Sequence, residues 1–234
     1  MARIEELDWR ETPMGEISLR RRVEPTLHVD VYEVRLGEEF LMSSLFTVAE
    51  VELARLGLAA VAGDRLDVVV GGLGLGWTAR SSLADPRVHA LHVVEALDAV
   101  IDWHERALLP HAAELTGDPR TRLVHADFFA LVAAPPAPPL PERWHAALVD
   151  IDHTPSHLLH PDHGGFYTST GLSRLAARLH PGGVFALWSD APPDPAFVAL
   201  LEDVFSEVAA HVVPFPNHHT GGTSTNTVYT AVRR

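Results

Sequence analysis

Short apolar runs alternate with stretches of helical spacing along most of the chain, and this alternation predicts a parallel β-sheet with crossover helices. The runs that predict strands are residues 66–70, 88–94, 122–125, 146–151, 184–188, 211–215 and 225–232. The stretches that predict helices are residues 77–83, 97–115, 128–133, 171–179 and 195–209. Only a Gly-rich polar loop, 216–224, separates the last two strands. Because so short a loop cannot hold a crossover helix, the final strand is expected to be antiparallel to its neighbour.

The N-terminal part of the chain has a different pattern. Residues 16–22 and 28–36 are rich in Val, Ile and Leu and are bounded by glycines, which predicts a small antiparallel β lobe. Residues 47–62 then follow helical spacing, with Thr47 as the expected N-cap and Glu50 at the matching third position of a capping box. We therefore divide the chain into a β lobe, 1–46, and a larger α/β domain, 47–234.

Composition narrows the classes of function. The 234 residues are 47% hydrophobic, enough to bury one substantial core, and the formal net charge of -13 argues against a nucleic-acid partner. A cationic or neutral small substrate fits this charge better. No apolar run approaches the roughly 20 residues that span a bilayer, and the first residues are charged and not signal-like. We expect a cytoplasmic protein that does not bind a membrane.

The chain contains neither cysteine nor lysine. The absence of cysteine excludes disulfides, thiolate nucleophiles and sulfur-ligated metals, and the absence of lysine excludes Schiff-base chemistry and a Walker-type phosphate lysine. Any bound metal would need histidine or carboxylate ligands.

Gly72, Gly74 and Gly76 follow the buried strand 66–70 directly, with the spacing GxGxG. Glycines at this place let the backbone approach a ligand, and the next helix offers its N-terminal amides. The alternative interpretation is a tight turn between strand and helix.

Acidic residues follow the next two predicted strands. Glu95 lies 19 residues after Gly76, where a carboxylate can accept both hydroxyls of a ribose. Asp127 ends the following strand, where it can accept from an adenine amino group while Phe128 covers the ring. A solvated Glu95 and a helix-capping Asp127 are the alternatives. Together with the glycines, the two carboxylates predict an adenosine site.

The loop 152–167 follows the fourth strand of the predicted sheet and is polar and His-rich, whereas 133–141 is a Pro-rich spacer. The loop's histidines and aspartates can supply zinc ligands, or the loop can form a lid with one histidine as acid, base or hydrogen-bond partner. Tyr167 either closes over a cationic acceptor or packs at the start of the next helix. Asp190 either caps a turn or reaches the acceptor. The potential zinc ligands in the loop 152–167 are His153, His157, His160, His163, Asp152 and Asp162.

These features resemble the S-adenosylmethionine-dependent methyltransferase fold and, within it, spermidine synthases and related aminopropyltransferases. The resemblance covers most of the chain and implies a Rossmann-like α/β domain of seven strands with an antiparallel last strand, preceded by the β lobe. It is carried by residues 12–15, 31–34, 71–76, Glu95, 118–120, Asp127, Asp150, 166–167 and 179–183.

The resemblance implies a role for each matched carboxylate. Glu95 would hold the ribose, Asp127 the adenine amine, and Asp150 would bind and deprotonate the acceptor amine. Two positions depart from the family. Gly74 stands where spermidine synthases usually have an Asp that grips the aminopropyl amine, and the usual second acidic residue after Asp150 is displaced to Asp152.

The function expected from the sequence is transfer of an alkyl group, of the aminopropyl kind, from S-adenosylmethionine or its decarboxylated form to a small amine or other nucleophile. Asp150 is the expected catalytic residue, with Asp152, His153 and Tyr167 on the acceptor side and no metal in the site. Methyl transfer is the alternative, favoured by Gly74, and a non-catalytic nucleoside-binding protein is a second. The resemblance also implies a homodimer.

Overall fold

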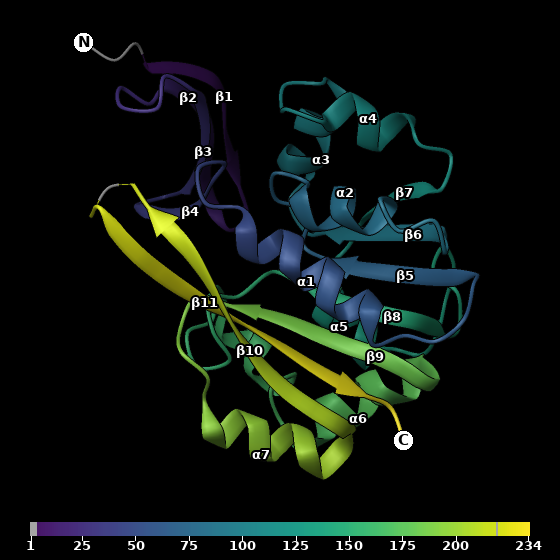
Figure 1. Ribbon diagram of the computed structural model, residues 1–234. Helices are drawn as coiled ribbons and strands as arrows, with labels where there is room; N and C mark the ends of the chain where they lie inside the picture. The colour runs from purple at the N-terminus through teal and green to yellow at the C-terminus, as the bar shows by residue number, and fades with distance from the viewer. Residues whose placement is uncertain (1–3, 219) are drawn as a thin grey trace.

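A mixed seven-stranded β-sheet forms the centre of the protein (Figure 1). The computed structural model describes residues 4–218 and 220–234. The strand order across this sheet is β10-β11-β9-β8-β5-β6-β7. Its strands are β5 (Leu66–Gly71), β6 (Val88–Glu95), β7 (Thr121–His125), β8 (Trp144–Val149), β9 (Leu179–Ser189), β10 (Ser206–Asn217) and β11 (Gly222–Val232).

The pairing of these strands confirms the seven-stranded α/β fold expected from the sequence. β5 pairs in parallel with β6 and β8, and β7 and β9 continue the parallel sheet on either side. β11 pairs antiparallel with both β9 and β10. The reversal of order beside β5 places the carboxyl ends of β5, β6 and β8 around one crevice, where open α/β sheets bind ligands.

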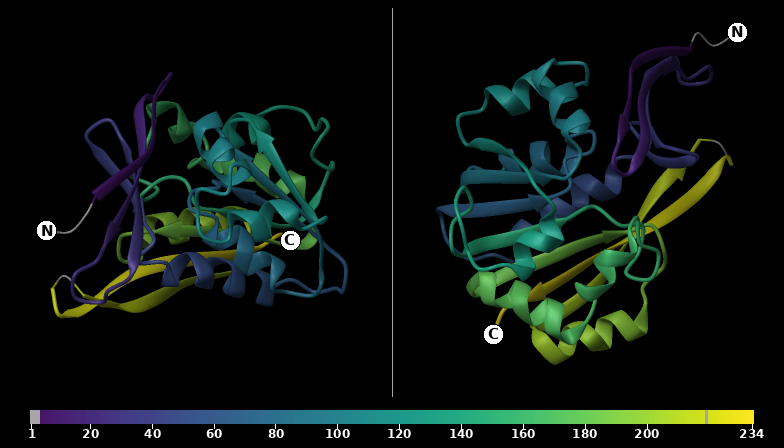
Figure 2. Two further views of the ribbon diagram at one scale, coloured as in Figure 1. Left: turned by 90° about the horizontal axis from the view of Figure 1, so that it is seen from above. Right: turned by 180° about the vertical axis from the view of Figure 1, so that it is seen from behind.

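Helices cover both faces of the sheet (Figures 1 and 2). The side chains of α1 to α4 share one buried cluster with the sheet, and those of α5 to α7 share a second cluster on its other face. Val68 and Val70 face the first cluster while Val69 faces the second, as the alternation of side chains along a strand requires. The helices are α1 (Val48–Ala59), α2 (Trp77–Leu83), α3 (Asp98–Glu105), α4 (Ala112–Gly117), α5 (Phe128–Ala133), α6 (Ser169–Arg178) and α7 (Pro195–Val204), with a short 3₁₀ helix η1 (Pro161–Gly165) before α6.

The expected N-terminal lobe is a four-stranded antiparallel sheet: β1 (Ile4–Thr12), β2 (Gly15–Val23), β3 (Asp30–Leu36) and β4 (Glu39–Ser43). It lies beside the carboxyl ends of the parallel strands (Figure 2). In Figures 1 and 2, the ends of β10 and β11 near their connecting turn reach this smaller sheet. The Phe46 and Phe215 ring centroids lie 5.6 Å apart.

Three predicted boundaries were wrong. The helix expected over 97–115 is two helices, because Pro110 interrupts the segment and Ala107 and His111 have φ of 54° and 66°. The helix expected over 195–209 ends at Val204, and the chain enters β10 at Ser206. The loop expected over 216–224 is largely strand, since β10 runs to Asn217 and β11 starts at Gly222.

The expected capping box at the start of α1 was also wrong. Thr47 is the N-cap residue, but its side chain makes no capping hydrogen bond. Glu50 lines a cavity at the crevice instead. None of the helices within 4–218 and 220–234 is long and apolar enough to cross a membrane.

Candidate active site

Two adjoining cavities open at the carboxyl ends of the parallel strands. Their volumes are about 340 Å³ and about 330 Å³. The first cavity reaches the ends of β6 and β7, and the second lies between α1, the N-terminal sheet and the end of β9. The residues that line both cavities are Leu41, Met42, Gly74, Asp150, Ile151 and Leu159. Asp150 is the one ionisable side chain in this shared set, so it lies where the two cavities meet.

The glycine loop forms the floor of the crevice. Gly72 has φ of +93°, and a Cβ atom there would lie 2.1 Å from the carbonyl oxygen of Asp150. Only glycine fits this close approach of two backbone segments. His104 supports the loop from below by donating from Nε2 to the Gly74 carbonyl at 3.0 Å. Burial lowers the pKa of His104, so the ring is a neutral donor at physiological pH.

A methionine occupies the space beside Gly74. Gly74 has φ of +48°, and a Cβ atom at this position would lie 3.0 Å from Sδ of Met42. Met42 comes from β4 of the N-terminal sheet and lines both cavities. The wall at this point is therefore apolar, where the resemblance implies an aspartate in the family.

Glu95 ends β6 with its carboxylate beneath the glycine loop. Its Oε2 accepts from the Leu73 amide and its Oε1 from the Leu97 amide, each at 2.9 Å. Burial raises the pKa of Glu95, and the surrounding backbone amides oppose that rise. Each carboxylate oxygen has further acceptor capacity, and Glu95 lines the first cavity, so these oxygens can accept hydrogen bonds from hydroxyl groups.

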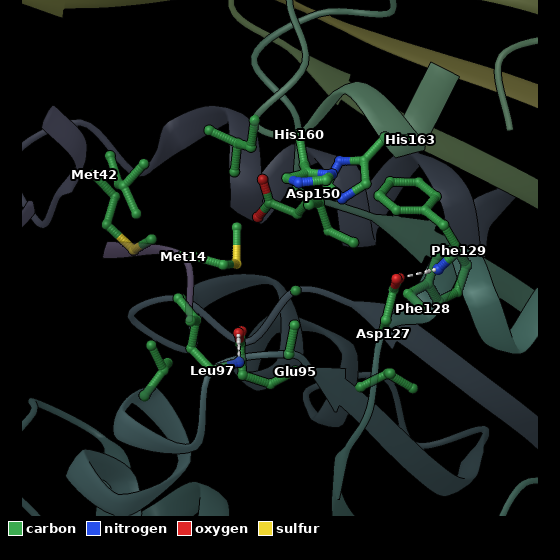
Figure 3. Close-up of a pocket in the computed structure, with 18 of the residues that line it drawn as sticks. Met14, Met42, Glu95, Leu97, Asp127, Phe128, Phe129, Asp150, His160 and His163 are labelled. Atoms are coloured by element: carbon green, nitrogen blue, oxygen red, sulfur yellow. Dashed lines mark hydrogen bonds between the residues drawn. The ribbon is translucent and has the colours of Figure 1, made fainter. Parts of the chain in front are cut away.

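Asp127 and Phe128 line the same cavity at the end of β7. Oδ1 of Asp127 accepts from the Phe129 and Ala130 amides at 2.8 and 3.3 Å, so this carboxylate caps α5. Figure 3 shows Asp127, Phe128 and Phe129 at one end of the cavity, with Asp150 and His163 on one side and Glu95 on the other. Capping uses one oxygen of Asp127 and therefore leaves the other for a ligand.

Asp150 follows β8 directly and is positioned by α2. Oγ1 of Thr78, in the first turn of α2, donates to Oδ2 of Asp150 at 2.8 Å. Burial raises the pKa of Asp150 to about 6, and the Thr78 hydrogen bond opposes this rise. A carboxylate with a pKa close to neutral is suited to accept a proton at physiological pH.

A second carboxylate near Asp150 is that of Glu50, in α1. Glu50 lines the second cavity together with Asp150. Burial and the nearby Asp150 charge raise the pKa of Glu50 to about 8. Two such carboxylates resist ionising together, because like charges repel strongly where water is excluded.

The remaining walls of the second cavity are acidic and aromatic. Asp190 follows β9 and lies at this cavity with Glu50 and Asp150, and no arginine of the described ranges lines either cavity. Carboxylates and ring faces both attract cations. The cavity is therefore suited to a positively charged ligand. Its aromatic lining consists of Phe40, Phe46, Trp77 and Trp188.

His153 closes the rim of this cavity by linking three segments. Its Nε2 lies 3.1 Å from Oε1 of Glu39, at the start of β4, and its Nδ1 lies 3.4 Å from Oδ2 of Asp190. The Asp190 amide also donates to the His153 carbonyl at 2.9 Å. His153 thus connects the N-terminal sheet to the central sheet beside the second cavity.

The structure places Asp152 and Tyr167 away from both cavity linings. Asp152 is 1% exposed and accepts three hydrogen bonds, from Tyr167 Oη at 2.9 Å, His163 Nδ1 at 2.8 Å and the Leu159 amide at 2.8 Å. Burial and the Asp152 charge raise the pKa of Tyr167, so the phenol remains protonated and donates. These bonds fix the loop after β8, and the loop then presents Leu159 to both cavities and His163 to the first.

The histidine loop is not helical between His153 and His157, although the two rings lie 4.9 Å apart between centroids. Within the described part of the chain, no group of three or more histidine, aspartate or glutamate side chains is arranged to hold a metal ion.

Sequence reasoning missed several residues of the crevice. Glu50 was assigned to helix capping, and Thr78 and His104 lie in predicted helices that have no motif of their own. Met42 comes from β4, a strand that the sequence pattern did not predict. The position of Thr78 just after the GxGxG motif is the one local signal that could have been used.

No protein-family model matches the chain, and no curated protein matches its sequence. Its fold, however, matches solved structures. A spermidine synthase from Thermotoga maritima aligns with a TM-score of 0.74 at 16% identity over 98% of this chain and 73% of that one. A spermidine synthase in complex with the transition-state analogue AdoDATO aligns with a TM-score of 0.76 at 16% identity over 98% and 74%. Human methyltransferase-like protein 13 in complex with SAH aligns with a TM-score of 0.57 at 17% identity over 78% and 81%.

These alignments define both the fold of the central domain and its N-terminal extension. The central sheet and its helices are those of the Rossmann-like methyltransferase fold. The alignments that cover 98% of the chain take in the N-terminal four-stranded sheet as well, so the chain has the spermidine synthase-like form of that fold. The resemblance found in the sequence is confirmed at this level.

Proposed function

We propose that the protein is a transferase that moves an alkyl group, of the aminopropyl kind, from an S-adenosyl sulfonium donor to an amine acceptor. The observation that carries the proposal is the junction of the two cavities at Asp150. One cavity has the carboxylates that suit a nucleoside, and the other has the acidic and aromatic walls that suit an amine. The structural neighbours, spermidine synthases and an SAH-bound methyltransferase-like protein, support this class of reaction.

The first cavity is assigned to the donor. Glu95 would accept the ribose hydroxyls and Asp127 the adenine amino group, with the Phe128 ring beside the base. Gly72, Gly74 and Gly76 would let the backbone approach the sulfonium end. The donor supplies a carbon that is already activated by positively charged sulfur, so the protein must mainly align the amine and remove its proton.

Asp150 is assigned as the base. It would bind the acceptor ammonium, take one proton from it and leave a neutral amine. The nitrogen lone pair then forms the bond to the donor carbon as the carbon–sulfur bond breaks, and the bonding electron pair goes to sulfur. Thr78 holds Oδ2 of Asp150 during this step through its 2.8 Å hydrogen bond.

The loop residues divide into two roles. His153 lines the second cavity and is assigned to the acceptor side, with Asp190. The sequence predicted Asp152 and Tyr167 on the acceptor side. We assign them instead to holding the loop, because they share a hydrogen bond and neither residue lines a cavity. No metal takes part in the proposed reaction.

Methyl transfer from S-adenosylmethionine is the second candidate. The apolar wall that Met42 makes beside Gly74 favours it, since no carboxylate at that position grips a donor amine. The protein would then use the same Asp150 junction with a different donor group.

The experiment is calorimetric titration with S-adenosylmethionine, its decarboxylated form and methylthioadenosine, followed by product analysis with candidate amines. Preference for the decarboxylated donor and transfer of its aminopropyl group support the proposal. Preference for S-adenosylmethionine with methylated product supports the second candidate. Binding of a nucleoside with equal affinity in wild type and Asp150→Asn, and without product, identifies a non-catalytic binding protein. Failure of all three to bind refutes the nucleoside site.

We also propose that the chain consists of a lobe, 1–46, and a catalytic domain, 47–234, and that it forms a cytoplasmic homodimer. Sedimentation at micromolar concentration tests the dimer, and a strictly monomeric boundary would contradict it.

A further inference from the structure

The Glu50 carboxylate lies in the crevice but has no role in the proposed transfer. Glu50 lies in the first turn of α1 and lines the second cavity beside Asp150. Thr78 connects the two residues, because its Oγ1 lies 2.8 Å from Oδ2 of Asp150 and 3.4 Å from the backbone carbonyl of Glu50. Thr78 thus bridges the Asp150 carboxylate and the α1 backbone at Glu50, and the Glu50 and Asp150 side chains that line this cavity are called the carboxylate pair below.

Among residues 4–218 and 220–234, no fixed positive charge lines the cavity of this carboxylate pair. The other titratable groups of the second cavity are His153 and Asp190, and His153 is already engaged by Glu39 and Asp190. No arginine in the described ranges lines the cavity. By contrast Glu52, two residues further along α1, has an arginine partner, since its Oε2 lies 2.6 Å from Nη2 of Arg55. Glu50 therefore has a local environment that ordinary surface glutamates lack.

We propose that Glu50 is a cation-binding residue of the reaction site, which shares one proton with Asp150 until the positively charged sulfur of the donor binds beside the pair and drives the proton off. The inference rests on the proposed function, because it assumes a sulfonium donor. Burial and the Asp150 charge, which raise the pKa of Glu50, support a pair that holds a proton in the ligand-free protein at neutral pH.

The charges of the complete reaction then balance. A sulfonium donor and an ammonium acceptor bring two positive charges, and the fully ionised pair supplies two negative charges. When Asp150 accepts the proton of the acceptor, the ionised Glu50 is left to hold the single positive charge that passes from sulfur to the new secondary ammonium. The proton that the pair releases on donor binding goes to solvent, so no further co-reactant is needed.

The test compares S-adenosylmethionine with S-adenosylhomocysteine, which differ at sulfur by one methyl group and one positive charge. We expect the preference of the wild type for the charged ligand to rise roughly tenfold between pH 6.5 and pH 8.5, because release of the proton becomes easier as pH rises. Titration of the wild type in two buffers of different ionisation enthalpy should also show that the charged ligand releases more protons than the uncharged one.

The matched variants are Glu50→Gln and Glu52→Gln, on the same helix. In Glu50→Gln the preference should be smaller and independent of pH, whereas Glu52→Gln should behave as wild type. A preference that does not change with pH in the wild type, equal proton release by the two ligands, or an unchanged slope in Glu50→Gln would overturn the proposal. Failure of both ligands to bind any variant would instead refute the nucleoside site, and with it the proposed function.

Discussion

Replacing Glu50 by glutamine is expected to increase the free energy of unfolding of the ligand-free protein relative to wild type progressively as the pH rises. Burial and the Asp150 charge raise the pKa of Glu50 from 4.5 to about 8, so the folded protein holds a proton that the unfolded chain releases above pH 4.5. Stability from this group is therefore lost progressively as the pH rises from about 4.5 to about 8. Glutamine cannot ionise and does not suffer this loss.

The size of the effect follows from the same shift. At 1.36 kcal/mol per pKa unit, a rise from 4.5 to about 8 corresponds to at most about 5 kcal/mol above pH 8. Most of this difference develops between pH 5 and pH 8.5. A buried glutamine amide has its own desolvation cost of about 1–3 kcal/mol, but that cost is equal at both pH values. We expect the variant to gain about 2–4 kcal/mol relative to wild type between the two conditions.

Urea unfolding at pH 5 and pH 8.5 measures this difference directly. Glu52→Gln is the matched control, because Glu52 is two positions away on α1 and pairs with Arg55 outside the crevice. Its effect on stability should be small at both pH values. If Glu50→Gln changed the free energy of unfolding equally at pH 5 and pH 8.5, Glu50 would not hold a proton in the folded protein, and the reasoning would fail.

Three other substitutions test the site. Gly72→Ala should abolish donor binding in calorimetry, because its Cβ would lie 2.1 Å from the Asp150 carbonyl, and wild-type affinity would disprove the close approach. Glu95→Gln should weaken donor binding at least roughly tenfold by replacing an acceptor oxygen with an amide donor, and unchanged affinity would remove Glu95 from the ribose site. Asp152→Asn should lower the free energy of unfolding by about 1–3 kcal/mol, because the buried Oδ2 that accepts from the Tyr167 hydroxyl becomes an amide donor. An unchanged urea midpoint would contradict that assignment for Asp152.

The central sheet could be predicted from sequence because its strands carry their own signal. Residues 68–70 of β5 and 146–149 of β8 are continuous apolar runs that are fully buried, which is typical of parallel strands between helical layers. β1 lacks such a signal, because most of its side chains are charged, and Glu5 pairs with Arg21 across the β1–β2 register. Such a strand shows no clear alternation of apolar and polar residues.

The donor half of the candidate site was easier to predict than the acceptor half. Gly72, Glu95 and Asp127 each lie at the carboxyl end of a parallel strand, so their meeting at one edge follows from topology alone. Glu50 and Met42 reach the crevice from α1 and β4, whose packing against the sheet is fixed by tertiary contacts. No local pattern distinguishes Glu50 from a first-turn glutamate that stabilises its helix.

The N-terminal sheet is part of the site and not an appendage to it. Met14 lines the first cavity, Phe40 the second, and Met42 both, so removal of the sheet would open the crevice to water on one side. Water would weaken every electrostatic interaction within it, including the repulsion that raises the pKa of the Glu50 carboxyl. The bond between His153 and Glu39 ties this sheet to the loop after β8. The electrostatics of the Glu50 and Asp150 pair thus depend on the docked position of the N-terminal sheet.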